Sequence, residues 1–267
     1  MLKGLPMKRI PLLLMIAGCL CWISTKAAAD VWNPIETNLR SNEKPRKILF
    51  IGNSYTYYND LDVVLKKLAA SGKLPVKLQT ARLVKGGATL QDHYTDPKTL
   101  AMIAKVKWDV IVLQEQSMRP VENPPAFFEY AIKLDAKIKK QGARPVFYMT
   151  WARQKKPEMT EPLDQAYTQM GRQLDAFVAP VGRAWAASLK ANPDINLYIE
   201  DGSHPTVYGT YLAACVFYTT LTGLSPVGLS NAGLEEITPP QALALQETAW
   251  KAVQAYAREQ AETTQKK

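Results

Sequence analysis

The sequence predicts an α/β fold, a three-layer α/β/α sandwich in which helices cover both faces of a parallel sheet. Short apolar segments alternate with segments whose apolar residues recur at helical spacing. The strand segments are apolar on both faces, as expected for strands covered on both sides. A chain of 267 residues has room for one sizeable domain of this kind.

Strands are expected at short apolar runs that end in glycine or polar residues. The first run, KILFIGN, stops abruptly at a small polar corner that carries a serine. The four expected strands lie at residues 47–53, 74–84, 108–117 and 144–153. A weaker strand-and-helix segment spans residues 180–192, and residues 195–205 lead from it into the next helix.

Helices are expected between these strands. In the first, Leu61, Leu65 and Leu68 lie on one face and Gly72 ends the helix. The expected helices span residues 60–73, 96–107, 124–142, 161–179, 206–223 and 239–262. Alternation of strand and helix implies parallel strands joined by crossover helices, a flavodoxin-like sheet.

In such a sheet, ligands bind beyond the carboxyl ends of the strands. The segments that leave those ends read GNS, KGG, QEQS and TWAR, and DGSHP arrives from a later loop. All but KGG carry side chains that can take part in acyl transfer, and KGG offers only backbone groups. This edge of the sheet is therefore the expected site.

The N-terminus has the order of a secretory signal peptide. A basic segment at residues 3–9 precedes an apolar stretch from residue 10 to about residue 23, and Ala27 and Ala29 fit an A-x-A cleavage site. The apolar stretch is shorter than the ~20 residues that a membrane span needs. Residues 1–29 are thus expected to be removed, leaving an extended lead-in and one domain.

A second processing signal overlaps the first. The segment IAGC resembles the bacterial lipoprotein box, which would leave Cys19 as a lipid anchor. The following LCWIS is more apolar than most lipoprotein tethers, which favours the alanine site. In both cases the protein is expected outside the cytoplasm, periplasmic or extracellular, with residues 30–45 as lead-in and 46–267 as the domain.

Charge and cysteine content exclude several classes of protein. The net charge of +9 is diffuse, with small clusters such as Arg153–Lys156, which favours a solubilising surface over a nucleic-acid site. Without residues 1–29 the chain keeps one cysteine, Cys215, so no internal disulfide is expected. Two separated histidines and one cysteine in an apolar helix make no metal-ligand set, and no cofactor is implied.

The corner after the first strand places Ser54 as a candidate nucleophile. A serine hydroxyl needs a base, usually histidine, and the chain has only His93 and His204. His204 precedes Pro205, and Asp201 lies three residues upstream, where its carboxylate can fold back onto the imidazole. Ser54, Asp201 and His204 therefore form a candidate catalytic triad.

An ester hydrolase also needs hydrogen-bond donors for the oxyanion of the tetrahedral intermediate. The backbone N–H of Ser54 and the backbone N–H of Gly87 are two candidates, because glycine permits close approach of the main chain. The side-chain amide of Gln116 or Gln114 is a candidate third donor.

These motifs resemble the blocks of the SGNH branch of the GDSL-type esterases. GNS with Ser54 resembles the first block, with Asn53 in place of the usual aspartate, and DGSHP matches the last block, Asp-x-x-His-Pro. Gly87 resembles the glycine of the second block. The third block, usually Gly-x-Asn-Asp, is replaced by QEQS, which sets Gln116 on the Asn position and leaves Gln114 or a water as alternatives.

Five further residues are candidate substrate contacts: Tyr55, His93, Gln114, Trp151 and Arg153. Each has an alternative structural role. His93 can be a capping or surface residue. Trp151 could stack on a sugar ring or simply pack, and Arg153 could bind a carboxylate or form a charged rim.

The resemblance implies a secreted ester hydrolase that acts through a Ser54 acyl-enzyme. An acylated carbohydrate, such as an O-acetylated glycan, is the first expectation, and an acylated small molecule is also compatible. A lipid or thioester hydrolase with the same triad is an alternative. A non-catalytic glycan-binding or scaffold protein of the same fold is another, since fold does not fix function.

Overall fold

The computed structural model describes Met1 and residues 44–73 and 75–265. Apart from Met1, the predicted signal peptide lies outside the described residues, as do both predicted processing sites and nearly all of the lead-in. The domain described below begins with a strand at Arg46.

Five parallel strands form the sheet, in the order β2-β1-β3-β4-β5. The strands are β1 (Arg46–Gly52), β2 (Leu78–Val84), β3 (Val110–Leu113), β4 (Arg144–Tyr148) and β5 (Phe177–Ala179). Every pairing is parallel. This is the flavodoxin-like order, so the predicted sheet is confirmed.

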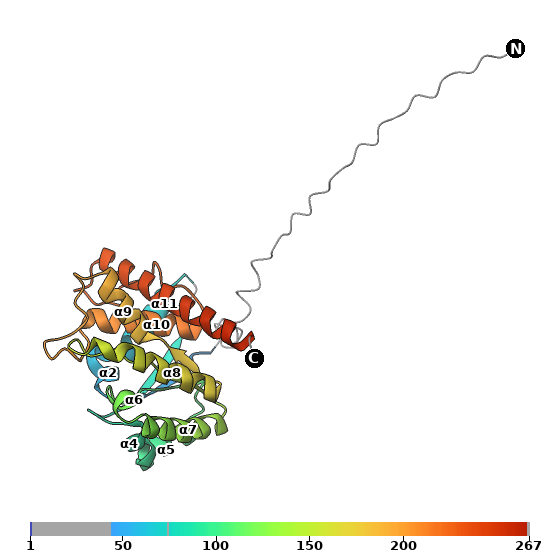
Figure 1. Ribbon diagram of the computed structural model, residues 1–267, viewed down its shortest axis with the longest axis vertical. Helices are drawn as coiled ribbons and strands as arrows, with labels where there is room; N and C mark the ends of the chain where they lie inside the picture. Colours follow the sequence, from blue (N-terminus) through green and yellow to red (C-terminus); the bar gives the residue numbers. More distant parts are fainter. Residues whose placement is uncertain (2–43, 74, 266–267) are drawn as a thin grey trace.

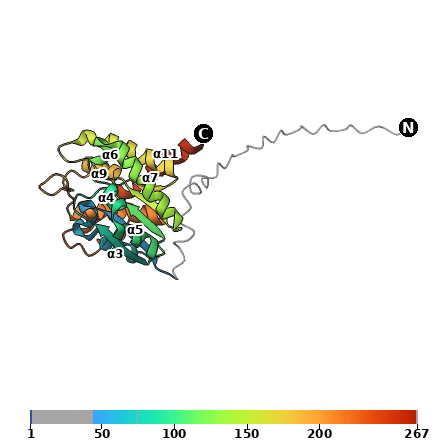
Figure 2. The same cartoon turned by 90° about the horizontal axis from the view of Figure 1, so that it is seen from below.

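Helices cover both faces of the sheet, as Figures 1 and 2 show. The helices, including two 3₁₀ segments labelled η, are α2 (Ser54–Tyr57), η3 (Tyr58–Asp60), α3 (Leu61–Ala70), α4 (Leu90–Thr95), α5 (Pro97–Lys105), α6 (Arg119–Glu122), α7 (Pro124–Lys140), η4 (Pro157–Met159), α8 (Thr160–Leu174), α9 (Val181–Ala191), α10 (Val207–Thr222) and α11 (Pro239–Gln265).

Alternate residues of β1 point to opposite faces of the sheet, each with its own hydrophobic core. Ile48 and Phe50 pack in the core formed with α3, α9, α10 and α11. Leu49 and Ile51 pack in the core formed with α4, α5, α7 and α8. The predicted three layers are confirmed.

Local sequence signals explain several helix ends. Asn123 caps the backbone N–H of Ala126 before the proline start of α7. Thr206 caps α10, and Gly223, with a φ of +71°, ends it in the left-handed conformation. Helix α10 is buried almost throughout, and Cys215 lies in its middle, 0% exposed. The core position predicted for this cysteine is confirmed.

Two elements differ from the prediction. The segment 161–179 was expected to be one helix, but α8 ends at Leu174 and β5 follows at once. Asp175 takes a left-handed conformation with a φ of 46°, which reverses the chain between the two elements. The segment 180–192 was expected to hold a strand and a helix, but it is the helix α9 alone, and the strand lies just before it, as β5. As expected, residues 195–205 lead into α10, and one antiparallel bridge joins Tyr198 and Pro205 there.

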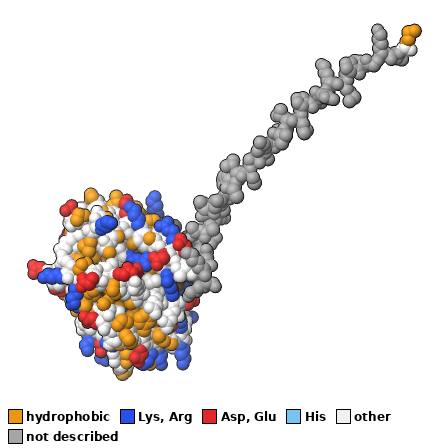
Figure 3. Space-filling model, in the orientation of Figure 1, with side chains coloured by type: hydrophobic (Ala, Val, Ile, Leu, Met, Phe, Trp, Pro, Cys, Tyr) orange, Lys and Arg blue, Asp and Glu red, His pale blue; other side chains and the backbone are white. Residues whose placement is uncertain are grey.

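Acidic and basic side chains mix on the face shown in Figure 3. Within the described part of the chain, no helix is both long and apolar enough to cross a bilayer.

Candidate active site

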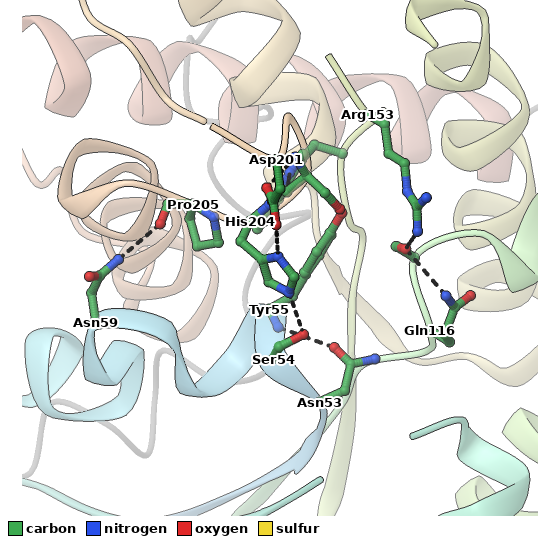
Figure 4. Close-up of polar contacts among 12 residues, drawn as sticks. Asn53, Ser54, Tyr55, Asn59, Gln116, Arg153, Asp201, His204 and Pro205 are labelled. Atoms are coloured by element: carbon green, nitrogen blue, oxygen red, sulfur yellow. Dashed lines mark hydrogen bonds and ion pairs between the residues drawn. The ribbon is translucent and has the colours of Figure 1, made fainter. Parts of the chain in front are cut away.

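The predicted site residues gather at the carboxyl ends of β1, β3 and β4, where Figure 4 shows them. Helix α2 starts at Ser54, two residues after the end of β1. The loop between α9 and α10 brings Asp201 and His204 over this corner, although it lies about 150 residues further along the chain.

Ser54, His204 and Asp201 form a continuous hydrogen-bonded line (Figure 4). His204 Nε2 lies 2.7 Å from Ser54 Oγ, and His204 Nδ1 is bonded to Asp201 Oδ2. Asp201 Oδ1 accepts the backbone N–H groups of Ser203 at 2.8 Å and of His204 at 2.9 Å. Although burial would raise the pKa of Asp201, the hydrogen bonds from His204 and Ser203 hold it below its usual value. The carboxylate therefore stays charged and can orient an imidazolium.

The Ser54 corner is fixed from beneath by two buried amides. Asn53 Oδ1 accepts the Tyr55 backbone N–H at 3.1 Å and Gln114 Nε2 at 2.9 Å, and its Nδ2 donates to the Ala88 carbonyl at 3.0 Å. Gln114 Oε1 accepts the Asn53 backbone N–H at 2.8 Å. An aspartate at position 53 could not donate to Ala88, so the amide suits the turn that carries Gly87.

His204 is held from the side by aromatic rings. Tyr58 stacks on the imidazole with ring centroids 4.4 Å apart and an angle of 19° between the planes. Tyr55 meets the same imidazole edge-on at 5.6 Å. Asn59 Nδ2 donates to the Pro205 carbonyl at 3.1 Å, which ties the segment after α2 to the histidine loop (Figure 4). These contacts hold the base against the nucleophile.

The backbone N–H groups of Ser54 and Gly87 are the predicted oxyanion donors, and this role stays a prediction. The N–H of Ser54 is at the first position of α2 and has no intrahelical acceptor. Gly87 lies in an exposed turn with a φ of +68°, and a Cβ there would meet nothing within 4 Å. The glycine is therefore favoured by its left-handed backbone, not by close packing.

Gln116 is engaged with its own loop. Its Oε1 accepts the backbone N–H groups of Met118 at 2.8 Å and Arg119 at 3.1 Å, which caps α6. Its Nε2 points to Ser117 Oγ at 3.4 Å. The amide oxygen is thus used within the loop, and the identity of the third oxyanion donor stays a prediction.

Four predicted substrate contacts are corrected by burial. Trp151 is 1% exposed, because Tyr55 covers one face of its ring and Trp185 the other, with centroids 4.4 and 3.9 Å away. Tyr55 is itself buried and bonds Ser203 Oγ through its hydroxyl at 2.7 Å. These residues support the site from within and do not reach a substrate.

The other two corrected residues are His93 and Gln114. His93 is 5% exposed, and its Nε2 lies 2.8 Å from the Gly52 carbonyl. Burial lowers the pKa of His93, which favours the neutral ring. Gln114 is fully buried, and its amide is used by Asn53, Thr56 and Glu115. Both fix the end of β1.

Glu115 was not singled out by the sequence, although it lies within the QEQS segment. Its Oε1 accepts the backbone N–H of Gln116 at 2.7 Å and of Leu90 at 3.1 Å, so it joins the loop after β3 to the start of α4. Burial raises the pKa of Glu115 to about 7, against the lowering effect of those two hydrogen bonds. A buried position could not be inferred from one acidic residue between two glutamines.

Among the described residues, no group of three or more His, Cys, Asp or Glu side chains is arranged to hold a metal ion. The site is built from a hydroxyl, an imidazole, a carboxylate and backbone N–H groups. These are the parts that acyl transfer through a serine requires.

Solved structures of known proteins are similar to this one. A putative SGNH hydrolase from Slackia heliotrinireducens is 29% identical and matches with a TM-score of 0.58, over 67% of this chain and 100% of that chain. The resemblance to the SGNH hydrolases is confirmed. The enzyme class expected from the sequence, an SGNH-type carboxylic ester hydrolase, agrees with this match.

Two further structures share the SGNH fold at lower identity. A DUF4886 family protein from Bacteroides uniformis is 18% identical, with a TM-score of 0.64 over 79% of this chain and 95% of that chain. A catalytic mutant of an acetylxylan esterase from Geobacillus stearothermophilus is 16% identical, with a TM-score of 0.52 over 68% of this chain and 96% of that chain. No family model matches the chain, and neither does any curated protein.

Proposed function

We propose that the protein is an exported serine esterase that removes acyl groups, acetyl in the first place, from a carbohydrate. The observation that carries this proposal is the hydrogen-bonded line from Ser54 through His204 to Asp201 at the carboxyl ends of the strands. The likeness to an acetylxylan esterase supports a carbohydrate ester as substrate. The signal-like N-terminus supports export.

The proposed reaction starts with attack of Ser54 Oγ on the acyl carbonyl carbon, while His204 Nε2 takes the hydroxyl proton. The carbonyl oxygen becomes an oxyanion, which the Ser54 and Gly87 N–H groups and a side-chain amide from the Gln116 loop stabilise. Asp201 stabilises the imidazolium. The C–O bond to the sugar then breaks, and His204 gives its proton to the leaving alkoxide.

The second half of the reaction removes the acyl group from Ser54. His204 takes a proton from a water molecule, which attacks the acyl carbonyl. The new tetrahedral intermediate collapses, the bond to Ser54 Oγ breaks, and His204 returns the proton to the serine. The products are a free acid and a deacylated sugar.

Hydrolysis of 4-nitrophenyl acetate tests the mechanism. Ser54→Ala should lower kcat by about 10⁴-fold or more, because the nucleophile is lost. A fluorophosphonate probe should label the wild type at Ser54 and leave the variant unlabelled. Ser225→Ala, an exposed serine in the loop after α10, is the matched control and should behave as the wild type.

Full activity of Ser54→Ala, in a protein with an unchanged circular dichroism spectrum, would refute the mechanism. A comparison of acetylated xylo-oligosaccharides, 4-nitrophenyl palmitate and an acyl thioester tests the substrate class. A clear preference for the palmitate or the thioester would contradict the carbohydrate proposal and leave the triad in place.

A further inference from the structure

Arg153 follows β4 at the catalytic edge and has no acidic partner within the described part of the chain. Its Nη2 donates to Ser117 Oγ at 3.1 Å, and its Nε is buried without a partner among the described residues. Of the four other partly exposed arginines, Arg46 and Arg183 bond a carboxylate, at 3.3 Å and 2.6 Å. Arg119 donates to Gln91 Oε1 at 2.5 Å, and Arg144 forms no ion pair with a described residue. Among the residues that the structure describes, Arg153 is thus a half-buried cation without a counter-ion.

The cost of this arrangement suggests a ligand. Removing a charged group from water is unfavourable unless a partner compensates it. A guanidinium carries a planar fork of donors that fits a carboxylate or a phosphate with two parallel hydrogen bonds. The hydrogen bond to Ser117 orients the fork and leaves Nη1 for such a partner.

The position of Arg153 is fixed relative to the triad. Three hydrogen bonds join its segment to the loop that carries Asp201 and His204: Gln154 N to the Gly202 carbonyl at 2.8 Å, Trp151 Nε1 to the Ser203 carbonyl at 3.0 Å, and the Tyr198 hydroxyl to the Ala152 carbonyl at 2.7 Å. Any group that Arg153 binds is therefore held in a defined place relative to the catalytic base.

Figure 4 shows which side of the site the arginine occupies. Arg153 reaches down toward the Gln116 loop, and Ser54 and His204 lie between it and Asn59. Arg153 also borders a cavity of about 450 Å³, which is lined by Trp151 and Trp185 and by no residue of the Ser54–His204–Asp201 line.

We propose that Arg153, oriented by Ser117, is an anion-binding subsite beside Ser54, and that the preferred ester lies on a sugar that carries a negative charge close to the acylated hydroxyl. The inference rests on the proposed esterase function and names its substrate class. A carboxylate sugar is the simplest such substrate, and a sugar phosphate carries the same charge chemistry. Without residues 1–29, which hold four of the 33 Lys and Arg and no acid, the net charge is +5 (29 minus 24), which favours encounter with acidic polymers.

The test compares two esters that differ by one charge, O-acetylated methyl glucuronoside and O-acetylated methyl glucoside. The measured quantity is the kcat/KM for the glucuronoside divided by the kcat/KM for the glucoside. The wild type should prefer the glucuronoside, and Arg153→Gln should lower this preference by roughly 10- to 100-fold, as expected for loss of a charged hydrogen-bonded pair. Arg153→Lys should fall between the two, because the charge remains but the fork is lost.

Lys155→Gln removes one positive charge from the same loop at an exposed position and is the matched control. It should keep the wild-type preference. A third ester, an O-acetylated glucose 6-phosphate, distinguishes a carboxylate site from a phosphate site. The proposal would be overturned if the wild type hydrolysed the glucuronoside and the glucoside with equal kcat/KM, or if Arg153→Gln kept the wild-type ratio of the two kcat/KM values.

A binding measurement separates failure of the subsite from failure of the esterase. Titration of the two methyl glycoside acetates into Ser54→Ala, and into the double variant with Arg153→Gln, needs no turnover. Tighter binding of the glucuronoside that disappears with Arg153→Gln supports the subsite even if no ester is hydrolysed. Equal binding of both esters contradicts it, whereas absent labelling of Ser54 by fluorophosphonate contradicts the esterase.

Discussion

The two halves of the candidate active site are built in opposite ways. The Ser54 corner is part of the core: Asn53 is 3% exposed and Gln114 is 0% exposed, and their amides bond each other. The Asp201–His204 loop lies at the surface, with side chains 43% and 25% exposed. Ser54, the proposed nucleophile, is therefore positioned by buried hydrogen bonds, and His204, the proposed base, by contacts at the rim. Mutations in the exposed Asp201–His204 loop should therefore lower activity more than stability, and mutations in the buried Ser54 corner should lower stability.

The largest effect is expected on the exposed side. Asp201→Asn keeps an oxygen for the backbone N–H groups of Ser203 and His204 but removes the negative charge beside His204 Nδ1. By analogy with other serine hydrolases, kcat should fall by about 10³- to 10⁴-fold. The free energy of unfolding should change by less than about 1 kcal/mol, because the carboxylate is exposed.

Steady-state kinetics on 4-nitrophenyl acetate and urea unfolding check this expectation. Asp194→Asn, an exposed carboxylate in the same loop region, is the control. A large loss of stability in Asp201→Asn would mean that the histidine loop contributes to the stability of the core. It would contradict the difference drawn here between the buried Ser54 corner and the exposed loop.

The buried side should show the reverse pattern. Gln114→Leu leaves the Asn53 backbone N–H and the Thr56 hydroxyl without their acceptor in the core. The free energy of unfolding should fall by about 2–4 kcal/mol, because two buried donors lose a partner. Urea denaturation measures it, with the exposed Gln173→Leu as the matched control. An unchanged midpoint would show that the corner does not depend on this amide.

Glu115 makes the buried side sensitive to pH. Burial raises its pKa from the ordinary value of 4.5 to about 7 in the fold, so the folded state keeps a proton that the unfolded state releases. Stability should therefore fall as pH rises from about 4.5 to about 7 and then level off. The loss is at most about 3.5 kcal/mol, for a shift of about 2.5 pKa units at 1.4 kcal/mol each.

Glu115→Gln keeps an acceptor for Leu90 and Gln116 and cannot ionise, so it isolates this effect. His93 acts in the opposite direction, since burial lowers its pKa and stability gains as pH rises toward 6.5. The charged groups nearest Glu115 are Arg119 and Asp92. The difference between wild type and Glu115→Gln in urea unfolding from pH 4.5 to 8 should show the slope. Parallel curves would exclude ionisation of Glu115 in this range.

The smallest effect concerns the link between the two halves. Asn59 donates to the Pro205 carbonyl and, at 3.0 Å, to Thr210 Oγ1. Asn59→Ala should lower stability by about 1 kcal/mol and kcat a few-fold, because the histidine loop loses a tie to the segment after α2.

Asn59 also has a φ of 50°, which alanine tolerates poorly. Asn59→Gly keeps that conformation and removes only the side chain. If the glycine variant matches the wild type in kcat while the alanine variant does not, backbone conformation and not the hydrogen bond is what Asn59 supplies.

The fold and the proximity of Ser54, His204 and Asp201 could be predicted because both rest on local patterns. Buried strands show as apolar runs, and Asp201 and His204 share one short motif. Strand β5 escaped prediction because its three residues follow a helical pattern without a glycine or proline between them. The reversal depends on Asp175 in a left-handed conformation, which a single aspartate does not signal.

The neighbours of the triad were harder to predict, because burial at the end of a strand depends on residues far along the chain. Trp151 leaves β4 on the active edge, yet Tyr55 and Trp185 close over both faces of its ring. Nothing near Trp151 in the sequence shows this stack. His93 likewise is covered because its imidazole meets the Gly52 carbonyl at the end of β1.

The direction of the parallel strands also determines which side of the protein faces a surface to which one end of the domain is attached. β1 begins at Arg46, at the opposite end of the strand from Ser54, and in Figure 1 α11 ends on the side of the molecule away from α2. Attachment to a bead, a sensor chip or a neighbouring domain through either end of this fold would leave Ser54 on the side away from the attachment point. Polymeric substrates too large to diffuse beneath the molecule would then still have access to it.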